Sequence, residues 1–182
     1  MNKEISGIIL TTEEIAAKVE DMAKEITCFY QQEKAEEVVV IGILRGAVIF
    51  LSDLVRHMGI PCRLDFMAVS SYGDKTQSSG SLRILKDITE DISGKHVLIV
   101  EDIIDTGLTY ESLKSVLWVR NPKTLSFCAF LNKPSRRMVD VSPDFCGFEI
   151  PDEFVVGYGL DYAGRYRELP YIGILDPSVY RK

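Results

Sequence analysis

The most chemically suggestive part of the sequence is the acidic segment VLIVEDIIDTGLT at residues 97–109. Its first half is a run of apolar residues, which predicts a buried strand. Glu101, Asp102 and Asp105 follow at the carboxyl end of this strand, and a Thr-Gly pair then precedes a helical pattern. In open α/β sheets, ligands bind at the carboxyl ends of the strands, so we expect a binding site here.

The turn after these acids has the features of a phosphate site. A glycine turn that enters a helix presents free backbone N–H groups and the positive end of the helix dipole, and Thr106 and Thr109 add hydroxyl donors. Three carboxylates would repel an anion unless they bind a cation such as Mg²⁺, sugar hydroxyls or a proton. A sugar phosphate is therefore a better candidate than a bare phosphate. The segment matches neither GxxxxGK[ST] nor GxGxxG, and the bare pattern fits a solvated acidic turn equally well.

Strand–loop–helix units must position this segment. VVVIGIL at 38–44 is a continuous apolar run, as expected for a strand buried on both faces, and the loop LRGA and a helical pattern follow it. The same order recurs at 96–119, and LSFCAFL at 125–131 supplies another buried run. Strands that alternate with helices predict an α/β fold with a mainly parallel sheet flanked by helices.

Two further segments complete the expected elements. Residues 12–33 carry apolar residues at helical spacing, and we expect a surface helix capped by Thr12. Two strand-like runs surround the polar tip GDKTQSSG at 73–80, which predicts a hairpin that could act as a flexible lid.

Length and composition indicate one soluble domain. The 182 residues are 46% hydrophobic and 26% charged, which are globular values. We expect a single domain, residues 1–182, with a core at about 12–131 and a small hood subdomain formed by 132–182 and the N-terminal segment. The longest apolar stretch is far shorter than the roughly 20 residues of a membrane-spanning helix, so we expect a cytoplasmic protein without a membrane partner.

Charge, cysteines and histidines exclude other kinds of site. The net charge of −6 argues against nonspecific binding to nucleic acid. His57 and His96 have no partner at metal-ligand spacing and are expected to be structural or surface residues. The cysteines also lack such spacing, and we expect reduced, mostly buried thiols at Cys28, Cys62, Cys128 and Cys146.

Taken in order, these segments resemble the type I phosphoribosyltransferases, and among them the hypoxanthine-guanine branch. The acidic segment is similar to the family's phosphoribosyl pyrophosphate signature of two acids, two aliphatics, then acid, Thr and Gly. LRGA resembles the pyrophosphate loop, SSY the flexible loop, LNKPSRR the purine-reading strand and FVVGYGLDYAGRYR the hood. The resemblance covers nearly the whole chain. It implies transfer of the phosphoribosyl group from phosphoribosyl pyrophosphate to hypoxanthine or guanine with Mg²⁺, giving IMP or GMP and pyrophosphate, in a homodimer or homotetramer.

The resemblance also implies roles for the residues of the acidic segment. Glu101 and Asp102 would face the ribose hydroxyls and magnesium, and Asp161 would lie near a second metal. Asp105 would be the general base that takes the proton from the attacking purine nitrogen. The phosphoribosyl group and its 5′-phosphate would be held by Glu101, Asp102, Asp105, Thr106, Gly107, Leu108 and Thr109. Leu108 replaces a residue that is often polar in the family, but binding through the backbone does not depend on it.

By the same resemblance, the other motifs contact pyrophosphate and purine. Arg45 and Gly46, in a loop that often contains a cis peptide, would bind pyrophosphate, and Arg167 would be a second contact to it. Ser71 and Tyr72 would close over the reacting sugar. The purine would be bound by Lys133, Phe154, Val155 and Asp161. Because the Lys133 ammonium group only donates hydrogen bonds, it suits a 6-oxopurine and not adenine. Without the resemblance, these residues would be interpreted as ordinary surface charges or core residues.

Two other functions remain open from the sequence. Some members of this fold sense nucleotides while they bind RNA, and a basic face would favour that function. A sugar-phosphate-binding domain with purely structural acids would bind its ligand without turnover.

Overall fold

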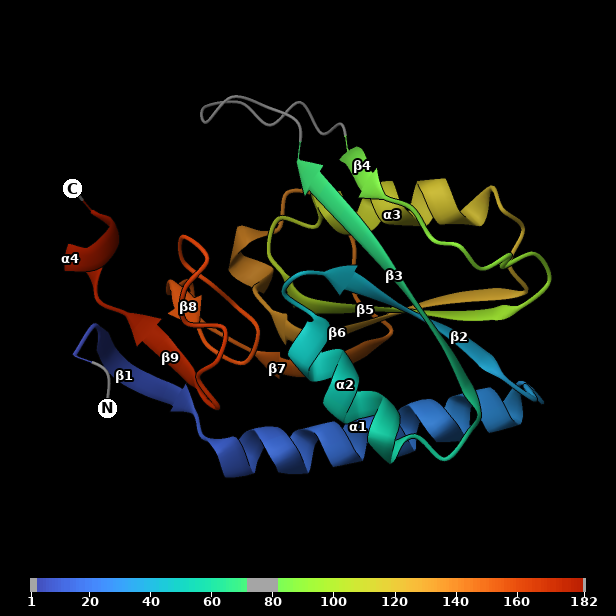
Figure 1. Cartoon of the computed structure of the whole chain (residues 1–182), viewed down its shortest axis with the longest axis horizontal. Helices are drawn as coiled ribbons and strands as arrows, with labels where there is room; N and C mark the ends of the chain where they lie inside the picture. Colours follow the sequence, from blue (N-terminus) through green and yellow to red (C-terminus); the bar gives the residue numbers. More distant parts are fainter. Residues whose placement is uncertain (1–2, 72–81, 182) are drawn as a thin grey trace.

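The main sheet of the computed structural model, which describes residues 3–71 and 82–181, has six strands in the order β4-β3-β2-β5-β6-β7 (Figure 1). Four neighbouring pairs are parallel, and only β3 and β4 pair antiparallel. The mainly parallel sheet predicted from the sequence is therefore confirmed. Its strands are β2 (Val38–Leu44), β3 (Cys62–Ser71), β4 (Leu82–Lys86), β5 (His96–Ile104), β6 (Thr124–Asn132) and β7 (Phe145–Glu149).

Helices cover both faces of this sheet (Figure 1). The helices α1 (Thr12–Gln32) and α2 (Val48–His57) pack on one face, and α3 (Leu108–Trp118) packs on the other. Because successive side chains of a strand point to opposite faces, Val38 and Val40 join one core cluster, and Val39 and Ile41 join the other. This burial on both faces explains why the central strands are continuous apolar runs.

The N-cap of α1 lies one residue earlier than the sequence suggested. Its N-cap is Thr11, whose hydroxyl accepts a hydrogen bond from the N–H of Glu14, while the Glu14 carboxylate accepts one from the N–H of Thr11. The expected cap at Thr12 is wrong, because only Thr11 has a glutamate three residues later to complete a capping box. The Thr12 hydroxyl instead donates to the carbonyl of Pro170.

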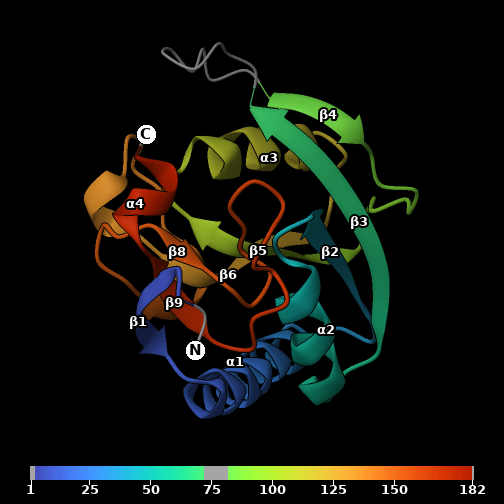
Figure 2. The ribbon, with the colours of Figure 1, turned by 60° about the vertical axis from the view of Figure 1, so that its left-hand side comes forward.

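A second, antiparallel sheet joins the two ends of the chain. It contains β1 (Ile5–Leu10), β9 (Ile172–Leu175) and β8 (Val155–Val156), in that order. The short helices η1 (Pro134–Arg136) and α4 (Pro177–Tyr180) flank these segments. Figures 1 and 2 show this sheet beyond the carboxyl ends of the parallel strands. The division into a core at about 12–131 and a hood stays a prediction.

Three smaller expectations concern the lid, the cysteines and the membrane. The antiparallel strands β3 and β4 flank the expected lid, but Tyr72 and the polar tip lie outside the described residues.

All four cysteines are free, yet only Cys128 is buried and Cys28 is exposed, so the expectation of mostly buried thiols is wrong. Cys28 lies on the outer side of α1, beside Gln32. In the described part of the chain, no helix is long and apolar enough to cross a membrane.

Candidate active site

Two consecutive acids, Glu101 and Asp102, lie near the carboxyl end of the central strand β5. Glu101 is only 7% exposed, and burial, together with the neighbouring charge of Asp102, raises its pKa to about 8. Burial also raises the pKa of Asp102 to about 6, although the N–H of Ile103, which donates to Asp102 Oδ1 at 3.0 Å, and the cation of Arg167 oppose this rise. Such acids are costly to ionise unless a cation or hydrogen-bond donors accompany them. These acids therefore favour a ligand that brings a cation or hydrogen-bond donors to the site.

The loop between β2 and α2 lies directly against one of these acids. The Leu44–Arg45 peptide bond is cis, as is often found in the loop that the sequence resembles. A Cβ atom at Gly46 would overlap the carboxylate of Asp102, and a Cβ atom at Gly159 would overlap the carbonyl of Gly46. Only glycine therefore allows this loop to lie between the acid on β5 and the turn after β8.

The turn after β8 also brings Arg167 and Asp161 to this place. Arg167 Nη2 lies 2.6 Å from Asp161 Oδ1, and Arg167 Nη1 donates to the carbonyl of Gly159 at 2.5 Å. The charges of Arg167 and Asp161 both act on Asp102. Arg167, expected to bind pyrophosphate, and Asp161, expected near a metal ion, are thus next to one another. Their direct ion pair was not anticipated from the sequence.

A small cavity lies on the other side of β5, at the start of α3. Gly107 is the N-cap of this helix and has a φ of 85°, a backbone conformation that favours glycine. The N–H of Leu108 donates to the hydroxyl of Thr106 at 3.4 Å. The cavity has a volume of about 90 Å³, room for about three waters or one phosphate-sized group. Its polar lining comes from Glu101, Asp105, Thr106, Gly107 and Thr109.

Asp105 is held by two arginines that sequence reasoning did not assign to the site. Its Oδ1 lies 3.0 Å from Arg136 Nε, an ion pair without the alignment of a hydrogen bond, and this oxygen is buried. Because the Asp105 side chain as a whole is 41% exposed, Oδ2 remains accessible. Arg137 Nη1 donates to the backbone carbonyl of Asp105 at 2.6 Å, and Arg137 also bonds the Asn132 side chain. Both arginines belong to the LNKPSRR motif, so the motif contained the signal.

The residues expected at the purine lie around the start of β8. Lys133 is 7% exposed, and its Nζ donates to the carbonyl of Glu153 at 2.6 Å. The Phe154 ring is 37% exposed, and it stacks on Tyr180 with ring centroids 4.9 Å apart. Val155 is buried as the first residue of β8. The aromatic ring of Phe154 and the buried ammonium group of Lys133 therefore both lie at the segment that leads into β8. The contact with Tyr180 was not suggested by the sequence.

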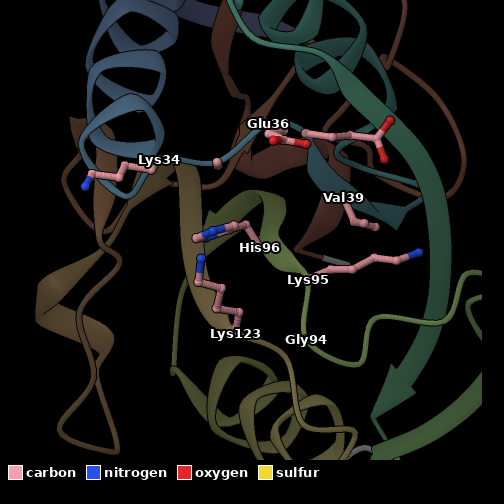
Figure 3. Close-up of a pocket in the computed structure, with 9 residues that line it drawn as sticks. Lys34, Glu36, Val39, Gly94, Lys95, His96 and Lys123 are labelled. Atoms are coloured by element: carbon pink, nitrogen blue, oxygen red, sulfur yellow. The ribbon is translucent and has the colours of Figure 1, made fainter.

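A wider cavity lies at the opposite edge of the sheet, where the parallel strands begin. It has a volume of about 420 Å³ and contains His96 and several lysines (Figure 3). Lys34 and Lys95 point in opposite directions, so these charges do not converge on one ligand (Figure 3). His96 Nδ1 lies 3.0 Å from Thr124 Oγ1, and His57 is exposed at the end of α2. Neither histidine is near the acids of β5, so the candidate site remains at the carboxyl ends.

The acids of the candidate site suit a hard cation whose ligands come partly from the protein and partly from a substrate. Among residues 3–71 and 82–181, no group of three or more His, Cys, Asp or Glu side chains is arranged to hold a metal ion. Mg²⁺ is usually held by one or two carboxylates together with substrate phosphates and water, without an all-protein cage. Asp102 and Asp161 interact electrostatically, which fits this mode of binding.

Comparisons with known proteins agree with this geometry. A model of the phosphoribosyl transferase domain matches residues 6–163. The hypoxanthine phosphoribosyltransferase of Haemophilus influenzae is 47% identical over 173 residues, which cover 95% of this chain and 97% of that protein. The hypoxanthine-guanine phosphoribosyltransferase of Bacillus subtilis is 47% identical over 180 residues, which cover 99% of this chain and 98% of that protein.

Solved structures extend the similarity to the whole fold. A hypoxanthine phosphoribosyltransferase from Staphylococcus aureus has a TM-score of 0.94 and 42% identity, with 99% of this chain and 96% of that chain covered. The Trypanosoma cruzi hypoxanthine phosphoribosyltransferase, in complex with the product IMP, has a TM-score of 0.93 and 40% identity, with 99% of both chains covered. The protein therefore belongs to the phosphoribosyl transferase domain family, as its motifs predicted.

Proposed function

We propose that this enzyme transfers the 5-phosphoribosyl group from phosphoribosyl pyrophosphate to hypoxanthine, guanine or both, and releases IMP or GMP and pyrophosphate. One observation carries the proposal. The acids Glu101 and Asp102 lie between the loop at Gly46 and the turn at Gly107, which are the two candidate anion sites. A ligand with a phosphate at one end and a pyrophosphate at the other matches this arrangement.

The two anion sites would hold the sugar substrate at its ends. Backbone N–H groups from Asp105 to Thr109 would bind the 5′-phosphate at the start of α3. Arg45, Gly46 and Arg167 would bind pyrophosphate, for which the forked donors of a guanidinium group are well suited. Mg²⁺ ions would be held by Glu101, Asp102 and Asp161 together with substrate oxygens, with Asp161 at a second ion, and they would supply positive charge beside the leaving pyrophosphate.

Asp105 is the candidate general base. A nitrogen of the purine attacks the anomeric carbon of ribose, and the carbon–oxygen bond to pyrophosphate breaks with its electron pair on pyrophosphate. The attacking nitrogen loses its proton to the accessible Oδ2 of Asp105, whose Oδ1 is occupied by Arg136. A base positioned in this way typically contributes a rate factor of about 10² to 10⁴.

Lys133 would set the preference for 6-oxopurines. Its ammonium group, which already donates to the carbonyl of Glu153, can donate a further bond to a 6-oxo group, whereas a 6-amino group offers it no acceptor. A site built on such a buried donor can discriminate by as much as about 10⁴ to 10⁵. Phe154 would stack on the purine, with Val155 and Asp161 at its edge. Closure of Ser71 and Tyr72 over the sugar, assembly as a homodimer or homotetramer, and a cytoplasmic location stay predictions.

Pyrophosphate release tests this function directly. The protein is incubated with phosphoribosyl pyrophosphate and Mg²⁺, and hypoxanthine, guanine, xanthine, adenine or uracil is offered separately. We expect turnover of 6-oxopurines only, its loss without divalent cation, and a fall of about 10² or more in Asp105→Asn. Asp140→Asn, an exposed substitution in the same region, is the matched control and should retain turnover. Ligand binding without turnover of any base would instead indicate a binding protein and would refute the proposal.

A further inference from the structure

A buried tyrosine connects helix α2 to the turn that carries Arg167. Tyr158 is 6% exposed, has a φ of 50°, and donates its hydroxyl hydrogen to Asp53 Oδ2 at 2.9 Å. Asp53 lies 105 residues earlier in the sequence, within α2. Burial and the bond to Asp53 raise the pKa of Tyr158, so the hydroxyl group remains a donor. The contact is thus a polar link between two elements that both reach the site.

This link completes a closed series of contacts around the loop at Gly46. The loop leads directly into α2, and α2 carries Asp53. From Tyr158 the chain continues to Gly159, whose backbone packs against the carbonyl of Gly46. Figure 2 shows the loop after β8 reaching toward the start of α2. Because the series returns to Gly46, the hydroxyl–carboxylate bond limits how far the two segments can separate.

The same turn fixes the position of Arg167. The N–H of Gly159 donates to the carbonyl of Arg167 at 3.1 Å, and Arg167 Nη1 returns a bond to the carbonyl of Gly159. Arg167 Nη2 pairs with Asp161. A shift of Gly159 away from Gly46 would therefore move both charged groups relative to Asp102.

We propose that the Tyr158–Asp53 hydrogen bond is a positioning contact for the pyrophosphate half of the site. It holds the turn with Gly159 and Arg167 against the loop at Gly46, and neither Tyr158 nor Asp53 needs to touch the substrate. The inference rests on the proposed function. It predicts a larger effect on phosphoribosyl pyrophosphate than on the purine, because Lys133 and Phe154 lie outside this series of contacts and only Asp161 belongs to both.

Tyr158→Phe and Asp53→Ala test the inference. The phenylalanine ring keeps the packing on Phe130, whose ring centroid lies 5.0 Å away, and removes only the hydroxyl group. We expect the KM for phosphoribosyl pyrophosphate and the inhibition constant of pyrophosphate to rise about fivefold to tenfold in each variant, about the effect of losing one ordinary hydrogen bond. The KM for hypoxanthine should stay within about twofold. The double variant should be no worse than either single variant, because both remove the same bond.

Tyr30→Phe is the matched control. It removes a buried tyrosine hydroxyl that donates to the carbonyl of Val97 at 3.0 Å, far from the loop at Gly46. The melting temperature of Tyr30→Phe should fall by about as much as that of Tyr158→Phe. Its KM for phosphoribosyl pyrophosphate should stay unchanged. An unchanged KM in Tyr158→Phe, an equal rise in Tyr30→Phe, or additive effects in the double variant would each overturn the inference. A wild-type protein that turns over no base would instead remove the proposed function, so the two failures are distinguishable.

Discussion

The buried carboxyl group of Glu101 should make the folded protein less stable as pH rises. We predict that Glu101→Gln, which keeps the shape of the side chain but cannot ionise, makes the metal-free protein more stable at neutral and alkaline pH. The pKa of Glu101 is raised to about 8 by burial and by Asp102. The folded protein therefore keeps a proton on this group that the unfolded chain has released.

Proton linkage gives the sign and the size of the effect. The ordinary pKa of glutamate is 4.5, and between this value and about 8 the folded state binds more protons than the unfolded state. The free energy of unfolding therefore falls as pH rises through this window. At 1.36 kcal/mol per pKa unit, the full loss above pH 8 is about 5 kcal/mol, a large share of the roughly 5–15 kcal/mol that stabilises most domains. The glutamine variant avoids this loss.

Urea unfolding in the presence of EDTA measures the effect. The advantage of Glu101→Gln over the wild type should be close to zero at about pH 4.5 and several kcal/mol at about pH 9. Glu111→Gln, an exposed substitution in the first turn of α3, should change the free energy of unfolding by no more than about 0.5 kcal/mol. A Glu101→Gln variant no more stable than the wild type at the higher pH, or equally more stable at both, would refute the reasoning.

Three more substitutions have clear expected outcomes. Gly46→Ala should lower turnover at least about 100-fold without unfolding the protein, since its Cβ displaces Asp102; circular dichroism checks the fold. Burial would raise the pKa of Asp65, but N–H donors, including that of Thr89, outweigh it and lower the pKa to about 2. Asp65→Asn should therefore cost about 2 kcal/mol in urea unfolding at about pH 7 and little at about pH 2. Lys133→Met should raise the KM for hypoxanthine at least about tenfold and leave that for phosphoribosyl pyrophosphate within about twofold.

The parts of the fold that the sequence predicted are those in which local pattern and tertiary burial agree. Strands β2, β5 and β6 are buried on both faces, so their sequences are continuous apolar runs. The acidic segment follows the run in β5, and the rule for parallel sheets places it at the binding edge. The cap at Thr11 was also readable, because Glu14 completes a capping box that Thr12 cannot form.

Contacts between distant segments could not be predicted in the same way. The pairing of Arg136 with Asp105, and the bond from Tyr158 to Asp53, join residues far apart in the chain. Each depends on the approach of separate elements, and neither leaves a periodic pattern in the sequence. The two-residue strand β8 is too short to have a period, so its pairing with β9 follows only from the folded structure.

The two consecutive acids of β5 show how alternation along a strand divides one site into two halves. Val97 and Ile99 face the core beneath α3, whereas Leu98 and Val100 face α1 and α2. Continuing this alternation, Glu101 lines the cavity at the start of α3, and Asp102 lies against the loop that leads into α2. A single acid could therefore not serve both places. If the proposed function holds, Glu101 and Asp102 allow the end of β5 to contact both the phosphate side and the pyrophosphate side of the same sugar.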